Sequence, residues 1–379
     1  MAKITWGVSN ETDSADYTSL IMSMSIRQGR EKYLDTYSGG SCVFTIKNYN
    51  NYAASINYGD RIVVYSTPPG VNSFALYFWV QEVTYNDYQG NTGLPTATIS
   101  CVDFMGRAGR VNAEALVLAQ ADTLNQAEKF NASQGGPLPS DMVVGGYGPN
   151  SGSIASATTY TGSVNNFINL LVTTERGYLI ERGLLYFISR TDAASLVPIA
   201  TTIGRTTSST QIAYQEFERI QNGTQFINTA TISPNGLASQ TATNTASKTT
   251  YGPAFYSSST QDYNTTQGLG NANWVVNNFS DPASLRFGCS FSDVMQNTTA
   301  LTSWIGQFWG LSAARCINLQ YQVPGGSLTT TTVIMEGVDI DVTPDQTNFK
   351  MSFSPLQYYQ FFTLNSTSLG VLDTSRLGW

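Results

Sequence analysis

The stretch from residue 39 to residue 48, GGSCVFTIKN, decides how the N-terminal part of the chain folds. In an extended strand, Cys42, Phe44 and Ile46 would lie on one face and their neighbours on the other. Two glycines precede this alternation and Asn48 follows it, as expected for turns at both ends. The stretch therefore predicts a half-buried antiparallel strand.

Similar alternating runs surround this strand within the first 110 residues. Their apolar side chains fall on single faces: Ile62 and Val64; Phe74, Leu76, Phe78 and Val80; Ala97, Ile99 and Cys101. Turn residues, including Pro68-Pro69-Gly70 and Asn86-Asp87, separate the runs. We expect residues 1–110 to form a β-barrel.

The apolar period changes after residue 110. Apolar side chains from Ala113 to Ala127 recur at helical spacing and predict a helix over Ala113–Phe130. The Gly-, Ser- and Pro-rich stretch Asn131–Thr159 then indicates an ordered loop or linker. Residues 111–162 are therefore interpreted as a helix and a Gly/Ser-rich linker.

A helix followed by a hairpin is the clearest local signal, and we assign it to a module over residues 163–214. Ser163 is the expected N-cap, and Gly177 the expected stop. The strands Tyr178–Ile180 and Leu184–Ile188 should pair across a short polar turn.

A second β-barrel is expected over residues 215–355, with a C-terminal extension over 356–379. Its elements are a strand Phe226–Ser233, a loop-rich stretch Gly236–Gln267, a helix at about 292–309 closed by Gly310, and strands at Ile317–Val323, Thr332–Val342 and Phe349–Pro355. Each β region ends with a long strand, a polar turn and a return strand, which suggests two related barrels. The predicted class is α+β and β-rich: two antiparallel β-barrels with a helix-hairpin module and inserted helices.

Composition narrows the range of functions. Only 12% of residues are charged, the net charge is −7, and no run of Lys or Arg occurs, which argues against a sequence-reading nucleic-acid binder. The chain has no histidine, so the commonest general base and metal ligand is absent. Cys42, Cys101, Cys289 and Cys316 form no C-x-x-C pair and should be buried thiols. We expect no export signal, no membrane insertion and synthesis in the cytoplasm.

Few residues offer chemistry. Asp339 and Asp341 would share one strand face near Asp345, so these three are weak candidates for a hard cation such as Ca²⁺, against the alternative of a solvated face. Carboxylates for a glycosidase pair exist at Glu31, Asp35, Glu175 and Glu181. The glycines at 145–148 and 268–270 resemble phosphate loops only weakly. We expect no catalytic residue, no cofactor and no enzyme activity.

Several segments, taken in order, resemble a known family. They are Gly29-Arg30 with Leu34 and residues 39–48; Gly59-Asp60-Arg61-Ile62-Val63-Val64; Thr98–Phe104; Ser163–Ile180 with Gly183–Arg190; Ser247 with Tyr251-Gly252; Glu336–Ile340 before Thr343-Pro344; and Leu369–Asp373. Their order resembles that of phage minor tail proteins, the tail hub or baseplate hub family of long-tailed phages. The likeness is weaker across Asn131–Thr159 and Gly236–Trp274.

The resemblance implies a structural virion protein with tube-like β-barrels. It implies a homo-oligomeric ring, expected to be a trimer, at the tail tip. Its expected partners are a distal tail or tail tube protein, a tape measure protein and tail fibre or tip proteins, with genomic DNA passing non-specifically through the lumen. The alternatives are a hexameric distal tail ring subunit, and a tail-associated cell-wall hydrolase or glycan-binding protein.

Overall fold

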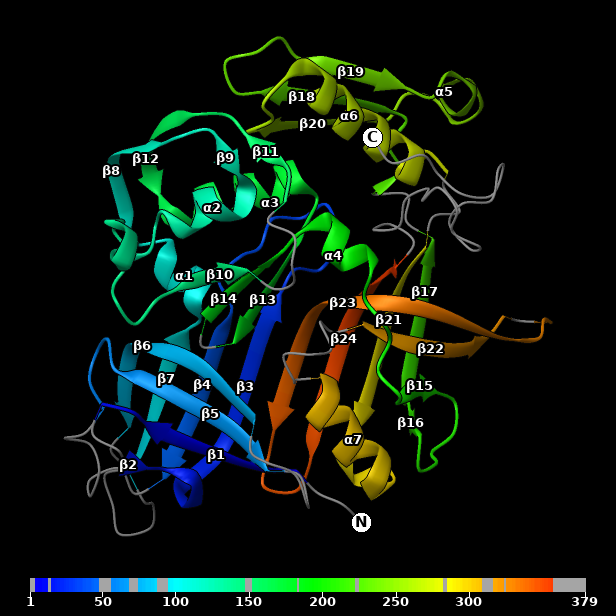
Figure 1. Cartoon of the computed structure of the whole chain (residues 1–379). Helices are drawn as coiled ribbons and strands as arrows, with labels where there is room; N and C mark the ends of the chain where they lie inside the picture. Colours follow the sequence, from blue (N-terminus) through cyan, green and yellow to red (C-terminus); the bar gives the residue numbers. More distant parts are fainter. Residues whose placement is uncertain are drawn as a thin grey trace.

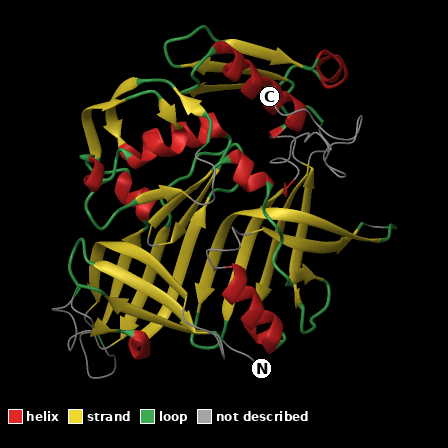
Figure 2. Cartoon of the chain, viewed as in Figure 1, coloured by secondary structure: helices red, strands yellow, loops and turns green. Residues whose placement is uncertain are grey.

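The computed structural model describes residues 4–12, 15–47, 56–67, 74–86, 95–146, 152–182, 184–221, 225–281, 285–308, 316–323 and 325–356. Within these ranges the main feature is a 14-stranded sheet, which occupies the lower part of the molecule in Figure 1. Most helices and the strands of the smaller sheets lie above it, whereas the helix Thr298–Phe308 lies beside its lower part (Figure 2). The β-rich α+β class expected from the sequence is confirmed. The predicted extension beyond residue 356 lies outside the described residues.

The N-terminal half of the sheet contains strands β1 to β7. These are β1 (Thr5–Asn10), β2 (Ala15–Asp16), β3 (Ile21–Gly29), β4 (Ser41–Lys47), β5 (Arg61–Thr67), β6 (Phe74–Asn86) and β7 (Thr96–Val102), in the spatial order β3-β4-β7-β6-β5-β1-β2. All neighbours are antiparallel. Cys42, Phe44 and Ile46 are buried while Val43 and Lys47 are exposed, so the predicted alternation of β4 is confirmed.

The C-terminal half is built from β15 (Thr202–Gly204), β16 (Gln211–Ala213), β17 (Glu216–Gln221), β21 (Leu285–Ser292), β22 (Cys316–Gln322), β23 (Leu328–Val342) and β24 (Thr347–Pro355). The helix expected at about 292–309 is α7, Thr298–Phe308. Its Trp304 is fully buried and makes edge contacts with Phe291 and Phe349, both at 5.0 Å between ring centroids. Gly310, the expected stop, lies outside the described residues.

The two halves repeat one arrangement of five strands. β3, β4, β5, β6 and β7 pair as β3-β4-β7-β6-β5, and β17, β21, β22, β23 and β24 pair in the corresponding order β17-β21-β24-β23-β22. The long strand of each half carries a bulge, between Val80 and Glu82 in β6 and between Met335 and Gly337 in β23. The two hairpins that the sequence matched are therefore equivalent elements of a repeat.

The expectation of two separate barrels is not met by the described strands. β3 pairs with Gly337–Val342 of β23, so the halves join edge to edge into one sheet. No pairing among the described residues closes either half on itself. A barrel removes its edges by pairing its own end strands, whereas here an edge of one half is paired by the other half. One apolar core serves both halves.

The predicted helix over Ala113–Phe130 is wrong in its first part. Residues 112–118 form strand β8 (Asn112–Leu118), which pairs with β12 (Thr158–Ser163), and only α2 (Thr123–Glu128) is helical. Ala115 has a positive φ of 53°, which a helix cannot accommodate. The partner strand lies 46 residues away from it in the supposed linker, so local spacing could not indicate it.

The stretch Asn131–Thr159, expected to be an ordered loop or linker, contains short strands that pair with neighbouring elements. It contributes β10 (Val144–Gly146) and β11 (Ile154–Ala155), and β10 pairs with the hairpin strand β14 (Leu184–Ile188). The buried side chain of Asn131 accepts from the backbone N–H of Val144 at 2.8 Å and donates to its carbonyl at 2.9 Å. This pair of hydrogen bonds ties the start of β10 to the segment around Asn131.

The helix-hairpin unit is confirmed. Helix α3 (Val164–Glu175) begins at Ser163, whose hydroxyl caps the Asn166 N–H, and β13 (Tyr178–Arg182) pairs with β14. The stop differs from the prediction, because Arg176 rather than Gly177 adopts the left-handed conformation, with φ of 55°. Gly177 is needed for close packing: a Cβ there would lie 2.5 Å from the Ile188 carbonyl oxygen.

A folded insert over residues 225–281 lies between β17 and β21, and it includes both the predicted strand Phe226–Ser233, which is observed, and the stretch Gly236–Gln267 predicted to be rich in loops. It contains β18 (Thr229–Pro234), β19 (Gln240–Thr243), α5 (Thr245–Tyr251), β20 (Phe255–Thr260) and α6 (Thr265–Phe279), and it forms the top of the molecule in Figure 1. The buried face of α6 includes Gly268, Gly270, Asn271 and Asn278. These small and amide side chains interrupt the apolar residues Trp274, Val275 and Phe279 on the same face, so the apolar period of the helix is weak in the sequence. No helix of the described residues is both long and apolar enough to cross a membrane.

Candidate functional site: the junction and edges of the sheet

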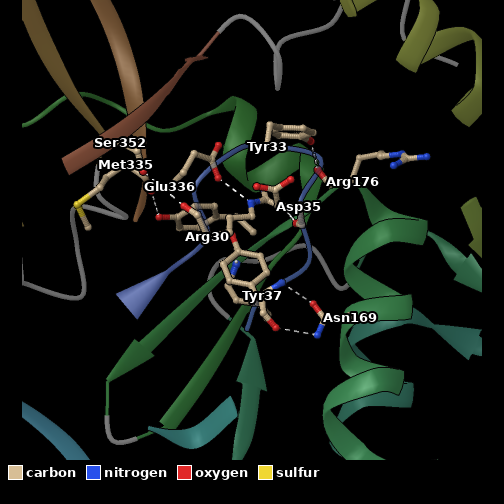
Figure 3. Close-up of polar contacts among 11 residues, drawn as sticks. Arg30, Tyr33, Asp35, Tyr37, Asn169, Arg176, Met335, Glu336 and Ser352 are labelled. Carbon is tan, nitrogen blue, oxygen red and sulfur yellow. Dashed lines mark hydrogen bonds and ion pairs between the residues drawn. The ribbon is translucent and has the colours of Figure 1, made fainter. Parts of the chain in front are cut away.

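The two halves of the sheet meet at a buried ion pair. The Arg30 Nε lies 2.7 Å from the Glu336 Oε2, with both side chains almost fully buried, and the Arg30 N–H donates to the Glu336 carbonyl at 2.8 Å (Figure 3). Glu336 occupies the bulge where β23 leaves β22 and begins to pair with β3. The pair therefore fixes the place where the two halves join.

Aromatic rings enclose the cation. The guanidinium carbon of Arg30 lies 4.8 Å from the ring centre of Tyr33 and 4.6 Å from that of Tyr37. Burial raises the pKa of both tyrosines, so their hydroxyls stay protonated. The Tyr33 hydroxyl donates to the Arg176 carbonyl at 2.7 Å, and Asn169 bonds both backbone groups of Tyr37 (Figure 3). The junction is thereby tied to helix α3 as well.

The segments that carried the family resemblance have structural roles here. Gly29 and Arg30 form the junction with Glu336, and Asp103 caps helix α1 (Phe104–Ala108) by accepting from the Gly106 N–H at 2.9 Å. Asp60 accepts from Asn10 and from the Asn57 N–H. The last segment, Leu369–Asp373, lies outside the described residues.

Two corresponding strand edges remain uncovered by any described strand. β3 pairs with both β4 and β23, whereas its equivalent β17 pairs only with β21. Gly337–Asp339 of β23 pair on both sides, whereas their equivalents Glu82–Thr84 of β6 pair only with β7. The chain therefore contains one pair of joined edges, those of β3 and β23. It also contains both members of the equivalent pair, the edges of β17 and β6, which are not joined to each other.

The sheet face opposite the apolar core is polar. It presents Thr45 and Thr98 in the first half and Arg27, Asp339 and Lys350 around the junction. A hollow of about 500 Å³ opens on this face, with charged side chains of both signs along its wall. Such a face cannot pack against an apolar layer, so it suits contact with water or with a polar ligand.

The three metal candidates do not converge on one point. Asp339 lies 3.7 Å from Arg27 and Asp341 accepts from the Ser25 hydroxyl at 2.8 Å, while Asp345 is exposed in the turn before β24. Burial raises the pKa of Asp339, against the influence of Arg27 and Lys350. No group of three or more candidate ligands that could hold a metal ion occurs in the part of the chain that the structure describes.

The carboxylates considered for a glycosidase are divided among separate contacts. Glu31 and Asp35 both line the hollow, but Glu31 is paired with Arg286 at 2.8 Å, which lowers its pKa, whereas a general acid needs a raised one. Glu175 is buried and accepts from the Ser153 N–H at 2.5 Å, and Glu181 accepts from the Phe104 N–H. No catalytic arrangement is evident among them.

The remaining sequence candidates have structural positions. Gly268 and Gly270 lie inside α6, and Gly145 and Gly146 in β10, with the rest of that cluster outside the described residues. The four cysteines are buried and free, and burial raises their pKa values, which keeps the thiols protonated and unreactive. Sequence reasoning missed the functional features described above, because edges and junctions depend on pairing between distant segments.

Comparison with known proteins gives no match to a protein-family description and none to a curated protein sequence. Solved structures do match. One is the tail protein from Neisseria meningitidis, with a TM-score of 0.64, 12% identity, and coverage of 93% of this chain and 96% of that one. Another is the 43 kDa tail protein of prophage MuSo2 from Shewanella oneidensis, with a TM-score of 0.62, 12% identity, and coverage of 94% and 99%.

A third match is the prophage tail protein gp18 from Listeria monocytogenes, with a TM-score of 0.50, 8% identity, and coverage of 92% of this chain and 94% of that one. At such low identities the agreement concerns the fold, and it extends over almost the full length of each chain. The chain has the fold of phage tail proteins.

Proposed function

We propose that this chain is a structural, non-enzymatic component of a phage tail tip, whose copies form a hub ring. The ring would connect the tail tube or distal tail ring to the tip or fibres, contact the tape measure protein, and leave a channel for DNA. The protein would be made in the host cytoplasm and carried in the virion. The observation that supports this most directly is the repeated five-strand unit with matching uncovered edges.

The repeat suggests how copies would join. Inside the chain, β3 of the first half meets β23 of the second. By the same contact, β17, the equivalent of β3, would meet β6, the equivalent of β23, in the next copy. Contacts of this head-to-tail kind generate a closed ring when the rotation per copy fits. We propose three copies, so that six equivalent half-sheets would surround the channel.

The polar face of the sheet would line that channel. Its acidic side chains Glu82, Glu216 and Asp341 are exposed, and the chain as a whole carries a net charge of −7. Repulsion between these carboxylates and phosphate groups would prevent DNA from adhering as it passes. The uncovered edges of β6 and β17 would instead be occupied by contacts between subunits.

The register of the internal contact predicts the register between copies. In the internal contact, Asp339 of β23 pairs with Arg27 of β3. When residues are counted from the two bulges and along the paired strands, Thr84 is equivalent to Asp339 and Ile220 is equivalent to Arg27. Residues directly opposite each other in an antiparallel pair have Cα atoms about 4.5–5.5 Å apart, a distance that a disulfide spans. A T84C/I220C variant should therefore cross-link between copies under mild oxidation.

The control is T84C/E216C, which moves the second cysteine four residues along β17, roughly 13 Å away. On a non-reducing gel we expect a ladder up to three chains from T84C/I220C and little from the control. Equal cross-linking in both variants would contradict the proposed register. Light scattering on the purified chain should give the mass of three copies, whereas six copies would support the distal tail ring, and one copy at every concentration would contradict a ring that forms without other tail proteins.

A further inference from the structure

The insert over residues 225–281 has almost no charge. Its charged side chains are Lys248, Asp262 and Asp281, and Asp262 is fully buried. Its three-stranded sheet has the order β19-β18-β20, and none of these strands contains a charged residue. One face of the sheet packs against α6 through Ala230, Ile232 and Ala242. The opposite face therefore offers only neutral groups.

That opposite face is an ordered array of hydroxyl groups. The register aligns Thr241, Thr231 and Ser257 in one row and Ser239, Ser233 and Ser259 in the next. Their spacing is about 4.8 Å between strands and about 6.8 Å along a strand. Thr231 bonds Thr241 at 3.0 Å and Ser233 bonds Ser239 at 2.9 Å. Because only one hydrogen is shared in each such pair, one hydroxyl of the two keeps a donor for another molecule.

Exposed aromatic rings lie next to these rows, at the end of the sheet where β20 begins. Phe255 begins β20 opposite Thr229 and is 71% exposed, and Tyr251 at the end of α5 is 59% exposed. Phe226 holds the Tyr251 ring by an edge contact at 5.6 Å between centroids, and the Lys248 ammonium lies 5.9 Å from the Phe255 centroid. These rings add exposed apolar surface beside the hydroxyl rows.

We propose that this face, the neutral outer face of β18, β19 and β20 with Phe255 and Tyr251, binds a neutral polysaccharide. Sugar hydroxyls would pair with the Thr and Ser rows, and the apolar C–H face of a sugar ring would stack on the aromatic rings. A nucleic acid is disfavoured because Lys248 is the only cation of the insert. A charged protein surface would find only Lys248 to pair with beside this face. The proposal goes beyond the ring and does not depend on it.

Affinity electrophoresis of the full chain through gels containing dextran, mannan or galactomannan tests this. We expect at least one of these neutral polymers to retard the wild-type chain, and the acidic polymer hyaluronate to have no effect. Retardation by none of the neutral polymers, or an equal effect of hyaluronate, would overturn the proposal and leave the face to a protein partner.

Two variants identify the surface. F255A/Y251A removes the exposed rings, and T231V/T241V replaces two of the three hydroxyls in one row with methyl groups of the same shape; we expect at least tenfold weaker binding in each. Y263A is the matched control, because Tyr263 is also exposed, at 46%, but lies between β20 and α6. Far-ultraviolet circular dichroism checks that each variant is folded. Undiminished binding by folded F255A/Y251A, or equal loss in Y263A, would overturn the assignment.

Discussion

At the scale of single residues, Gly29 is the position that allows the two halves of the sheet to approach each other. Its φ is +88°, and a Cβ built there would lie 2.1 Å from the Glu336 carbonyl oxygen and 2.8 Å from the Gly337 Cα. The neighbouring Arg30 N–H donates to that same carbonyl at 2.8 Å. A side chain at residue 29 would therefore displace the backbone that holds the junction together.

The variant G29A tests this close approach, with G59A as its control. Gly59 has nearly the same φ, +87°, but nothing lies within 4 Å of its added Cβ. Both variants carry the left-handed strain of about 1–2 kcal/mol, and only G29A adds a backbone clash. We expect urea denaturation to give a free energy of unfolding at least ~2 kcal/mol lower for G29A than for G59A, a size typical of overpacking. Equal losses would show that the junction tolerates a side chain.

The sequence could predict which strand residues are buried, but not what they meet. The alternation around Cys42 and Phe44 is a local property, and both are buried as expected. Gly29-Arg30 was recognised as part of a motif, yet its partner Glu336 lies 306 residues further along the chain. Nothing in the spacing of either segment relates them. A buried ion pair becomes predictable only when the pairing of distant strands is known.

At the scale of elements, the insert is attached to α3 through a buried polar cluster. Asn271 on α6 donates to the Thr174 carbonyl at 3.1 Å and to Asp262 at 2.8 Å, and the Gln261 N–H donates to the Thr174 hydroxyl at 2.8 Å. Burial raises the pKa of Asp262, although hydrogen bonds from Thr260 and Asn271 and the charges of Arg176 and Arg190 oppose the shift. The attachment should therefore depend on pH.

The direction of this pH dependence follows from the linkage between proton binding and folding. With its pKa raised in the folded state, Asp262 stays protonated after the unfolded chain has lost that proton, so its contribution to stability is greatest at low pH and falls as pH rises through the folded pKa. We expect the stability of wild type relative to D262N to decline in urea denaturation as pH rises from about 4, the ordinary pKa of an aspartate in the unfolded chain, through the raised pKa of the folded state. D345N makes the same chemical change in an exposed turn and serves as the control. A difference that grows with pH would contradict the shift.

Helices and strands could be predicted where the spacing of apolar residues along the sequence marks them. The apolar stripe and Ser163 cap of α3 identified that helix, and its hairpin followed from alternation. Helix α6 was missed because glycine, alanine and asparagine make up much of its buried face, and a Cβ at Gly268 would lie only 2.7 Å from Pro234. The apolar residues of β8 recur at helical spacing and therefore predict a helix. The contacts that make this segment a strand come from its partner β12. Close packing and non-local pairing leave little trace in local spacing.

At the scale of the whole molecule, two equivalent half-sheets form one polar face on the side away from the core. Lys47, Arg27 and Lys350 lie on that face together with Glu82, Glu216 and Asp341. The alternation of each strand predicted that one side would be polar. That both halves would present it together follows from the contact between β3 and β23, whereas the repeated hairpins of the sequence suggested two related barrels and not this contact.

The proposed channel requires that this face repel DNA. We expect no retention of linear double-stranded DNA by the wild-type chain in a mobility-shift assay at about 0.15 M salt, with any affinity weaker than about 10⁻⁴ M. E82K/E216K places two cations beside Arg27, Lys47 and Lys350, whereas E114K/D345K places them on other exposed surfaces; each exchange adds two positive charges, so both variants move the net charge from −7 to −3. DNA should be retained by E82K/E216K more strongly than by E114K/D345K, and the retention should weaken as salt rises. Retention by the wild-type chain, or equal retention by both variants, would argue that this face is not the surface along which DNA passes.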